Sequence, residues 1–102
     1  GTHDNDTTAG WFASLDEATR ARVKRSLSCD DAQVVSRMIE EAYRSVAGLA
    51  IVPLQDLLGL GGEARMNIPG AAENNWRWRA PHGSMDLGLA ERYRLLADST
   101  QR

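Results

Sequence analysis

The feature that most constrains this 102-residue chain is one short apolar run, Leu49–Leu54, which contains no polar side chain. A run that is apolar without alternation is typical of a parallel strand that is buried on both faces. Pro53 is expected to end this strand, because proline cannot donate to a hydrogen-bonded ladder. No other segment of the chain offers a strand to pair with it. The sequence therefore predicts that the sheet partners of Leu49–Leu54 belong to residues outside this chain.

The segments on both sides of this run have helical patterns. Ser14 and Glu17 form a predicted capping box, so we expect a helix over 15–27. A second helix is predicted over 32–47, because apolar side chains recur there every three or four residues and Gly48 can end it. The remaining predictions are helical turns at 7–12 and 55–58, irregular structure over 61–81, and a final helix over 86–97 capped by Ser84.

Composition and charge exclude several classes of protein. Apolar residues make up 42% of the chain and charged residues 25%, which is ordinary for one soluble domain. A formal net charge of −2 gives no electrostatic basis for nucleic acid as the main partner. No apolar stretch approaches the roughly 20 residues that span a bilayer, so no membrane is expected. The single cysteine, Cys29, fits a reducing compartment, and we expect a cytoplasmic protein.

A dense polar cluster stands at the start of the chain, in His3, Asp4, Asn5 and Asp6, followed by two threonines. Carboxylates, an amide and an imidazole can together ligate a cation, but the spacing differs from that of an EF-hand. A catalytic carboxylate with neighbouring groups that bind a polar substrate is the favoured interpretation, and a capped helix start is the structural alternative. We expect neither a metal ion nor a cofactor. Because the cluster opens the chain without a preceding element, we expect a piece of a longer protein.

A glycine-rich segment, 59–67, follows the apolar run. It lacks the Gly-Lys-Ser/Thr sequence of a phosphate-binding loop. Its glycines are expected to let the backbone approach a ligand closely, and Arg65 and Asn67 offer directional donors to hydroxyl groups.

Tryptophan and arginine alternate in the segment 76–79. In an extended backbone, Trp76 and Trp78 would face one way and the two arginines the other. Two interpretations stay open: the indole rings pack into the core beneath the loop, or they stack on sugar rings or bases.

Three long motifs carry a resemblance to a known family. They are GTHDNDTTAGW at residues 1–11, AIVPLQDLLGLGGEARMN at 50–67 and PGAAENNWRWR at 69–79. In this order they resemble the C-terminal portion of a 4-alpha-glucanotransferase (amylomaltase, or disproportionating enzyme) of the alpha-amylase superfamily. The helices between the motifs are compatible with this resemblance.

The resemblance implies an α/β parent protein folded as a (β/α)8 TIM barrel. It makes residues 1–102 a single fragment of the catalytic barrel, with the strand-7 loop, helices, strand 8, an active-site loop and a C-terminal helix. His3 and Asp4 would follow the seventh strand, and Ile51–Val52 would lie on the eighth, at the barrel face where active sites are found. The fragment itself is expected to be mainly α, with one short buried strand at Leu49–Leu54.

The chemistry implied by the resemblance is retaining transglycosylation on alpha-1,4-glucans. Such enzymes use a nucleophile and an acid/base carboxylate about 5–5.5 Å apart. A third family carboxylate, which stabilises the oxocarbenium-like transition state, matches Asp4. His3, Arg65 and Asn67 are the predicted substrate-binding residues. The nucleophile and the acid/base have no match in this chain, so we expect it to be inactive alone, with maltooligosaccharides and the N-terminal part of its own barrel as partners.

An alternative function is a self-sufficient helical carbohydrate-binding or interaction module that uses Trp76 and Trp78. Strand–helix repeats with two further catalytic carboxylates upstream of Gly1 would favour the enzyme instead. If this chain is crystallised alone, Leu49–Leu54 is expected to be extended and either paired with another chain or buried in a contact, because exposed edges recruit partners.

Overall fold

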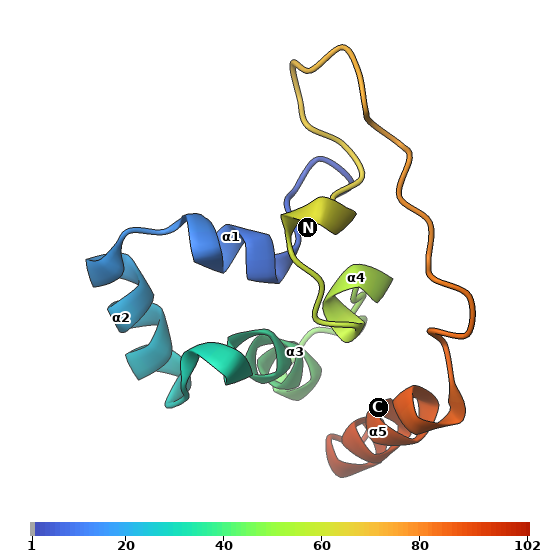
Figure 1. The fold of residues 1–102 in the computed structure, drawn as a ribbon. Coiled ribbons are helices and arrows are strands. Elements are labelled where there is room, and N and C mark those ends of the chain that lie inside the picture. Colours follow the sequence, from blue (N-terminus) through green and yellow to red (C-terminus); the bar gives the residue numbers. More distant parts are fainter. Residues whose placement is uncertain (1) are drawn as a thin grey trace.

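The computed structural model describes residues 2–102, which form a helical structure without strands (Figure 1). No helix in this part of the chain is long and apolar enough to cross a membrane. The helices are α1 (Thr8–Ser14), α2 (Glu17–Leu27), the 3₁₀ helix η1 (Asp31–Gln33), α3 (Val34–Arg44), α4 (Leu54–Leu57), the 3₁₀ helix η2 (Gly62–Ala64) and α5 (Leu87–Ser99).

The small core lies where α1, α3 and η2 meet. α3 has the clearest apolar stripe and contributes the buried side chains Val34 and Ile39. Phe12 from α1 and Ala64 from η2 are also buried. α2 and α5 contact α3 as well, so α3 is the central helix of the chain (Figure 1).

The C-terminal helix is fastened to the rest of the chain at two points. The hydroxyl of Tyr93 donates to the carbonyl of Leu57 in α4 at 3.4 Å, and burial raises the pKa of this tyrosine. Just beyond α5, the Arg102 guanidinium donates to the carbonyl of Tyr43 in the last turn of α3 at 2.6 Å and to that of Ala47, beyond the helix, at 2.8 Å. The Tyr43 carbonyl lies at a helix C-terminus, where intrahelical partners are missing.

Three predicted helix boundaries were wrong, and each has a local cause. α1 extends to Ser14, whose hydroxyl donates back to the carbonyl of Trp11, so Asp16 caps α2 instead. α3 ends at Arg44 rather than near Gly48, because Ser45 is extended. The N-cap residue of α5 is Asp86 and not Ser84, because the Asp86 carboxylate accepts the hydrogen bond from the amide of Leu89 at 2.8 Å.

The predicted buried strand at Leu49–Leu54 is absent. Residues 49–53 have no regular structure, the side chain of Ile51 is 82% exposed, and Leu54 begins α4. The cause is the one that the sequence raised: a strand needs hydrogen-bonded neighbours, and residues 2–102 supply none. Pro53, which was expected to end the strand, instead serves as the N-cap residue of α4.

The chain is more open than a compact domain of its size. Its radius of gyration is 14.6 Å, against about 13 Å for a compact domain of 100 residues. Its accessible surface of 7213 Å² exceeds the roughly 5,700 Å² expected for a monomer of this mass. A long irregular segment, 66–86, extends away from the helices before it reaches α5 (Figure 1). The chain by itself therefore leaves much apolar surface uncovered, including Val46, Leu49, Ile51, Met85 and Leu87.

Candidate active-site wall around Asp4

The loop that precedes α1 and the segment that follows η2 meet at Asp4. The amide nitrogen Nδ2 of Asn67 donates to Asp4 Oδ1 at 2.7 Å. Arg65 fixes the two backbones together, because its Nη2 donates to the carbonyl of Asp4 at 2.7 Å and its Nε donates to the carbonyl of Asn67 at 2.9 Å. The guanidinium thus holds the main chain on both sides of the contact, while Asn67 orients the carboxylate itself.

His3 lies on the same carboxylate oxygen. Its Nε2 is 3.2 Å from Asp4 Oδ1, and both side chains remain about half exposed. The imidazole ring also lies against Trp76, with 5.0 Å between ring centroids and 44° between the ring planes. Within residues 2–102, Asp4 Oδ2 has no hydrogen-bond partner, and the Asp4 side chain is 48% exposed. One oxygen is held in place, and the carboxylate as a whole stays about half exposed.

Thr7 connects this loop to α1. Its hydroxyl oxygen accepts a hydrogen bond from the amide of Gly10 at 3.1 Å, which is the N-cap interaction of the helix. Thr7 is buried, in contrast to the exposed start of the loop. On the exposed side, the carbonyl of Thr2 accepts from the amide of Asn5 at 3.0 Å and closes a turn around Asp4. Asp4 therefore lies in a tight turn, and this turn is followed by Thr7, the buried N-cap residue of α1.

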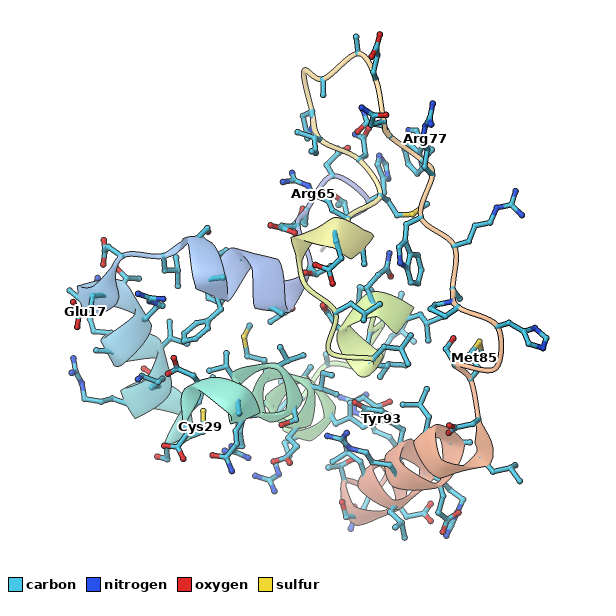
Figure 2. The ribbon with its side chains drawn as sticks, in the orientation of Figure 1. Glu17, Cys29, Arg65, Arg77, Met85 and Tyr93 are labelled. Carbon is cyan, nitrogen blue, oxygen red and sulfur yellow. The ribbon has the colours of Figure 1, made fainter. Side chains whose placement is uncertain are left out.

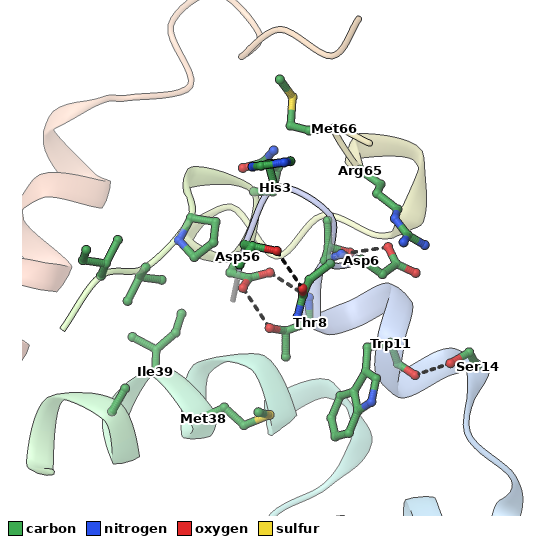
Figure 3. Close-up of a pocket in the computed structure, with 18 residues that line it drawn as sticks. His3, Asp6, Thr8, Trp11, Ser14, Met38, Ile39, Asp56, Arg65 and Met66 are labelled. Atoms are coloured by element: carbon green, nitrogen blue, oxygen red, sulfur yellow. Dashed lines mark hydrogen bonds between the residues drawn. The ribbon is translucent and has the colours of Figure 1, made fainter. Parts of the chain in front are cut away.

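Asp56 of α4 clamps the first turn of α1 (Figure 3). Its Oδ1 accepts from the amide of Thr8 and its Oδ2 accepts from the hydroxyl of Thr8, both at 2.8 Å. A carboxylate at a helix N-terminus is favoured by the unpaired amides and by the helix dipole. These two bonds join segments 48 residues apart and fix the start of α1 against α4.

The Asp6 carboxylate occupies a niche between two glycines. It accepts a hydrogen bond from the amide of Thr7 at 2.7 Å. A Cβ atom on Gly10 would lie 2.5 Å from this carboxylate, and one on Gly62 would lie 3.4 Å from it. The glycine-rich segment was expected to let the backbone approach a ligand. In this structure Gly62 lies beside an aspartate of the same chain, at a distance where a Cβ atom would make ordinary contact.

A hollow of about 820 Å³ opens beside this loop. Figure 3 shows His3 and Arg65 near one end, Thr8 and Asp56 in the middle, and Met38 and Ile39 of α3 opposite them. Ile51 and Val52, from the segment predicted as a strand, also line it. Within residues 2–102 no cluster of three or more His, Cys, Asp or Glu side chains could hold a metal ion.

The structure brings together all four residues that the sequence singled out, His3, Asp4, Arg65 and Asn67; their roles stay a prediction. Sequence analysis named Asp6 only as a member of the polar cluster, and it missed Asp56, which anchors the loop. A helix N-terminus favours a carboxylate, but nothing in the sequence pattern identifies Asp56 as the one that binds the start of α1. The contact between Trp76 and His3 was also not foreseen.

Solved structures define the class of fold to which this arrangement belongs. The chain superimposes with a TM-score of 0.91 on an amylomaltase from Streptococcus agalactiae determined in complex with acarbose. The match has 25% sequence identity and covers 100% of this chain and 21% of the amylomaltase.

Sequence comparisons identify the family. A profile of the 4-alpha-glucanotransferases matches residues 1–85, and the chain belongs to this family. A 4-alpha-glucanotransferase from Synechocystis is 51% identical over 80 residues, which cover 78% of this chain and 16% of the relative. The enzyme from Solanum tuberosum, named as chloroplastic/amyloplastic, is 49% identical over 82 residues, covering 79% and 14%. The Thermus thermophilus enzyme is 39% identical and covers 100% of this chain and 22% of the relative. The chain thus spans about a fifth, or less, of the length of these relatives.

Proposed function

We propose that this chain forms one wall of the active site of a 4-alpha-glucanotransferase, which transfers alpha-1,4-glucan segments between maltooligosaccharides by retaining transglycosylation. The observation that carries this proposal is the Asp4 carboxylate, with Oδ1 held by Asn67 at 2.7 Å and the side chain 48% exposed. Membership of the family supports the reaction, and acarbose in the related amylomaltase supports a glucan-like ligand.

In the proposed mechanism, Asp4 stabilises positive charge that develops on the sugar ring in the oxocarbenium-like transition state. A carboxylate that is already oriented needs no reorganisation when that charge appears, and such preorganised groups contribute strongly to catalysis. His3 would bind a hydroxyl of the same sugar. Arg65 and Asn67 were predicted to bind substrate. Their contacts with Asp4 add a second role, which is to position its carboxylate.

The nucleophile and the acid/base would come from other parts of the enzyme. In a retaining glycosidase these two carboxyl groups stand about 5–5.5 Å apart, and the nucleophile forms a covalent glycosyl-enzyme. In the proposed reaction, a sugar hydroxyl then attacks the anomeric carbon in place of water, and the bond to the nucleophile breaks. The acid/base carboxylate takes the proton of that hydroxyl. This chain would supply Asp4 and part of the cleft.

The proposed parent fold is a (β/α)8 barrel in which residues 49–53 form a strand once the preceding strand is present. The exposure of Leu49 and Ile51 supports this, because a buried barrel strand would leave its apolar side chains uncovered when its neighbours are missing. A cytoplasmic location is part of the same proposal. Plant relatives, among them those from Solanum tuberosum and Arabidopsis thaliana, are named as chloroplastic/amyloplastic, which describes those proteins.

A chimera tests the proposal. This chain would replace the matching segment of the Thermus thermophilus relative, whose alignment covers all of it. We expect the chimera to release glucose from maltotriose by disproportionation. We expect Asp4→Asn to lower kcat at least about a hundredfold while the thermal midpoint stays within a few degrees, because the loss falls on the transition state. The matched control is Asp98→Asn, an exposed aspartate at the end of α5, which should leave kcat unchanged.

Two results would count against the proposal. One is a folded chimera without disproportionating activity, and the other is an Asp4→Asn variant with near-native turnover. The alternative of a separate binding module predicts instead that the 102-residue chain binds maltotriose without the rest of an enzyme. The family matches over most of the chain favour the enzyme.

A further inference from the structure

Trp76 combines high exposure with an uncommon backbone conformation. Its side chain is 57% exposed although its ring lies against His3, the neighbour of Asp4. Its backbone has φ of +60°, a left-handed conformation that is rare for bulky side chains and is common for glycine. Residues in such conformations persist where the surroundings impose them, and they cluster at functional sites.

The loop before Trp76 is built to hold it there. The side chain of Asn75 bridges the loop, because its Oδ1 accepts from the amide of Ile68 at 2.9 Å and its Nδ2 donates to the carbonyl of Ala71 at 3.0 Å. The amide of Trp76 then donates to the carbonyl of Met66 at 2.6 Å. This bond brings Trp76 back beside the segment that contains Asn67. From Trp76 the chain continues past Arg77 along the irregular segment (Figure 2).

The position of the ring relative to Asp4 follows from these contacts. His3 links the two, with Nε2 at 3.2 Å from Asp4 Oδ1 and its ring centroid 5.0 Å from that of Trp76. The indole is more than half exposed, and only His3 lies between it and the carboxylate. An apolar ring face is therefore available close to a polar group. A pyranose ring has the complementary character, with an apolar face of C–H groups and polar hydroxyls at its edge. Amphipathic aromatic side chains suit such ligands.

We infer that Trp76, whose ring lies against His3, forms a platform that stacks on the glucose unit next to the one that Asp4 contacts. The platform would therefore recognise an oligosaccharide rather than a single sugar. This inference rests on the proposed function for its ligand, since it takes the substrate to be an alpha-1,4-glucan. It assigns Trp76 to binding and leaves the bond-making steps to the carboxylates.

The left-handed backbone allows a sharp test, because glycine fits φ of +60° without strain. Trp76→Gly removes the ring and suits the backbone, whereas Trp76→Phe keeps an aromatic face. Each change is made in the chimera that carries Asp4→Asn, and the binding of maltotriose and of glucose is measured by calorimetry. The active chimera with each change gives kcat and KM. The neighbouring Arg77→Ala, also exposed and in the same loop, is the control.

We expect Trp76→Gly to weaken maltotriose binding at least about tenfold, to raise KM by a similar factor and to change kcat less than threefold. Glucose binding should change far less, and the thermal midpoint should be unchanged or higher. Trp76→Phe and Arg77→Ala should stay within about threefold of the parent in maltotriose binding.

Unchanged maltotriose binding in Trp76→Gly would overturn the inference, and so would a lower thermal midpoint with native binding, which marks a structural ring. Equal losses for glucose and maltotriose would also overturn it. A parent chimera that binds maltotriose without transferring it contradicts the proposed function alone, since binding still decides the role of Trp76. A folded parent that binds no maltotriose overturns both.

Discussion

At the scale of single residues, the position of Asp4 depends on contacts made by groups that take no part in the proposed chemistry. Asp6 is one of them. Its carboxylate accepts from the amide of Thr7 and fills the space beside Gly10 and Gly62. A side chain on Gly10 would lie within 2.5–2.7 Å of that carboxylate. A Cβ at this helical position would therefore displace the Asp6 carboxylate.

We predict that Gly10→Ala destabilises the folded chain, although alanine is favoured over glycine in a helix by about 1 kcal/mol. The new methyl group would displace the Asp6 carboxylate and break its bond to Thr7, at a cost of roughly 1–3 kcal/mol that exceeds the gain. Urea unfolding of the chimera measures the change. In an Asp6→Ala background, where the niche is empty, the same substitution should stabilise. Stabilisation in both backgrounds would contradict this account of the niche.

At the scale of secondary-structure elements, α1 is held by its first turn. Asp56 of α4 accepts two hydrogen bonds from Thr8, and Thr7 caps the helix on the adjacent side. α1 has only seven residues, and so short a helix is marginal without tertiary contacts. The clamp therefore sets where α1 begins, and with it the position of the turn around Asp4.

We predict that Thr8→Val lowers the free energy of unfolding of the chimera by roughly 1–2 kcal/mol, because Asp56 Oδ2 loses a partly buried partner. Asp56→Asn should cost a similar amount, and the two changes together should cost less than their sum. Thr100→Val is the matched control, since that hydroxyl donates only to carbonyls of its own helix. Strict additivity of Thr8→Val and Asp56→Asn would show that the clamp is not a coupled unit.

The start of α2 is predicted to depend on pH. Asp16 Oδ1 accepts from the amide of Thr19 at 2.7 Å, and this backbone hydrogen bond is the main cause that holds the pKa of Asp16 below its ordinary value of 3.8. A pKa that is lower in the folded state adds stability above the unfolded pKa, and this stability is lost as pH falls through the folded pKa. Asp16→Asn should therefore flatten the decline of the thermal midpoint between about pH 5 and pH 2. An equal decline in parent and variant would rule out this cap as its source.

At the scale of the whole molecule, the chain leaves a surface that its own residues do not cover. The irregular segment 49–53 exposes Leu49 and Ile51, and the hollow of about 820 Å³ lies beside the same segment. The match to the full length of this chain in an amylomaltase five times longer is consistent with that surface being internal in the proposed parent enzyme.

We predict that the 102-residue chain on its own releases no glucose from maltotriose, because the proposed nucleophile and acid/base lie outside it. We also predict that it self-associates through residues 49–53, since an unpaired apolar segment recruits strands of other chains. Sedimentation measures the association, which Ile51→Lys should weaken. Glucose release by the purified chain would contradict the first expectation, and a monomer at high concentration would contradict the second.

The helices and the residues of the candidate site could be predicted from local patterns. The apolar periodicity of 34–44 indicates a helix because side chains three and four residues apart share a face, and the motifs around His3, Asp4, Arg65 and Asn67 indicated the family. The exact ends of the helices were harder to predict from the sequence. Ser14 and Asp16 are both good caps, and the choice between them depends on how far α1 continues.

What the sequence by itself determined is therefore the family, the helical segments and the group of polar residues around Asp4, because each is encoded in neighbouring residues or in a specific motif. Only the tertiary structure decided that Asp56 clamps α1, that Asp6 lies beside Gly62 and that Trp76 lies against His3. These contacts join residues tens of positions apart, and local propensity carries no information about them. The same reason explains the strand that did not form: Leu49–Leu54 has the composition of a buried strand, but a strand exists only where a neighbour pairs with it.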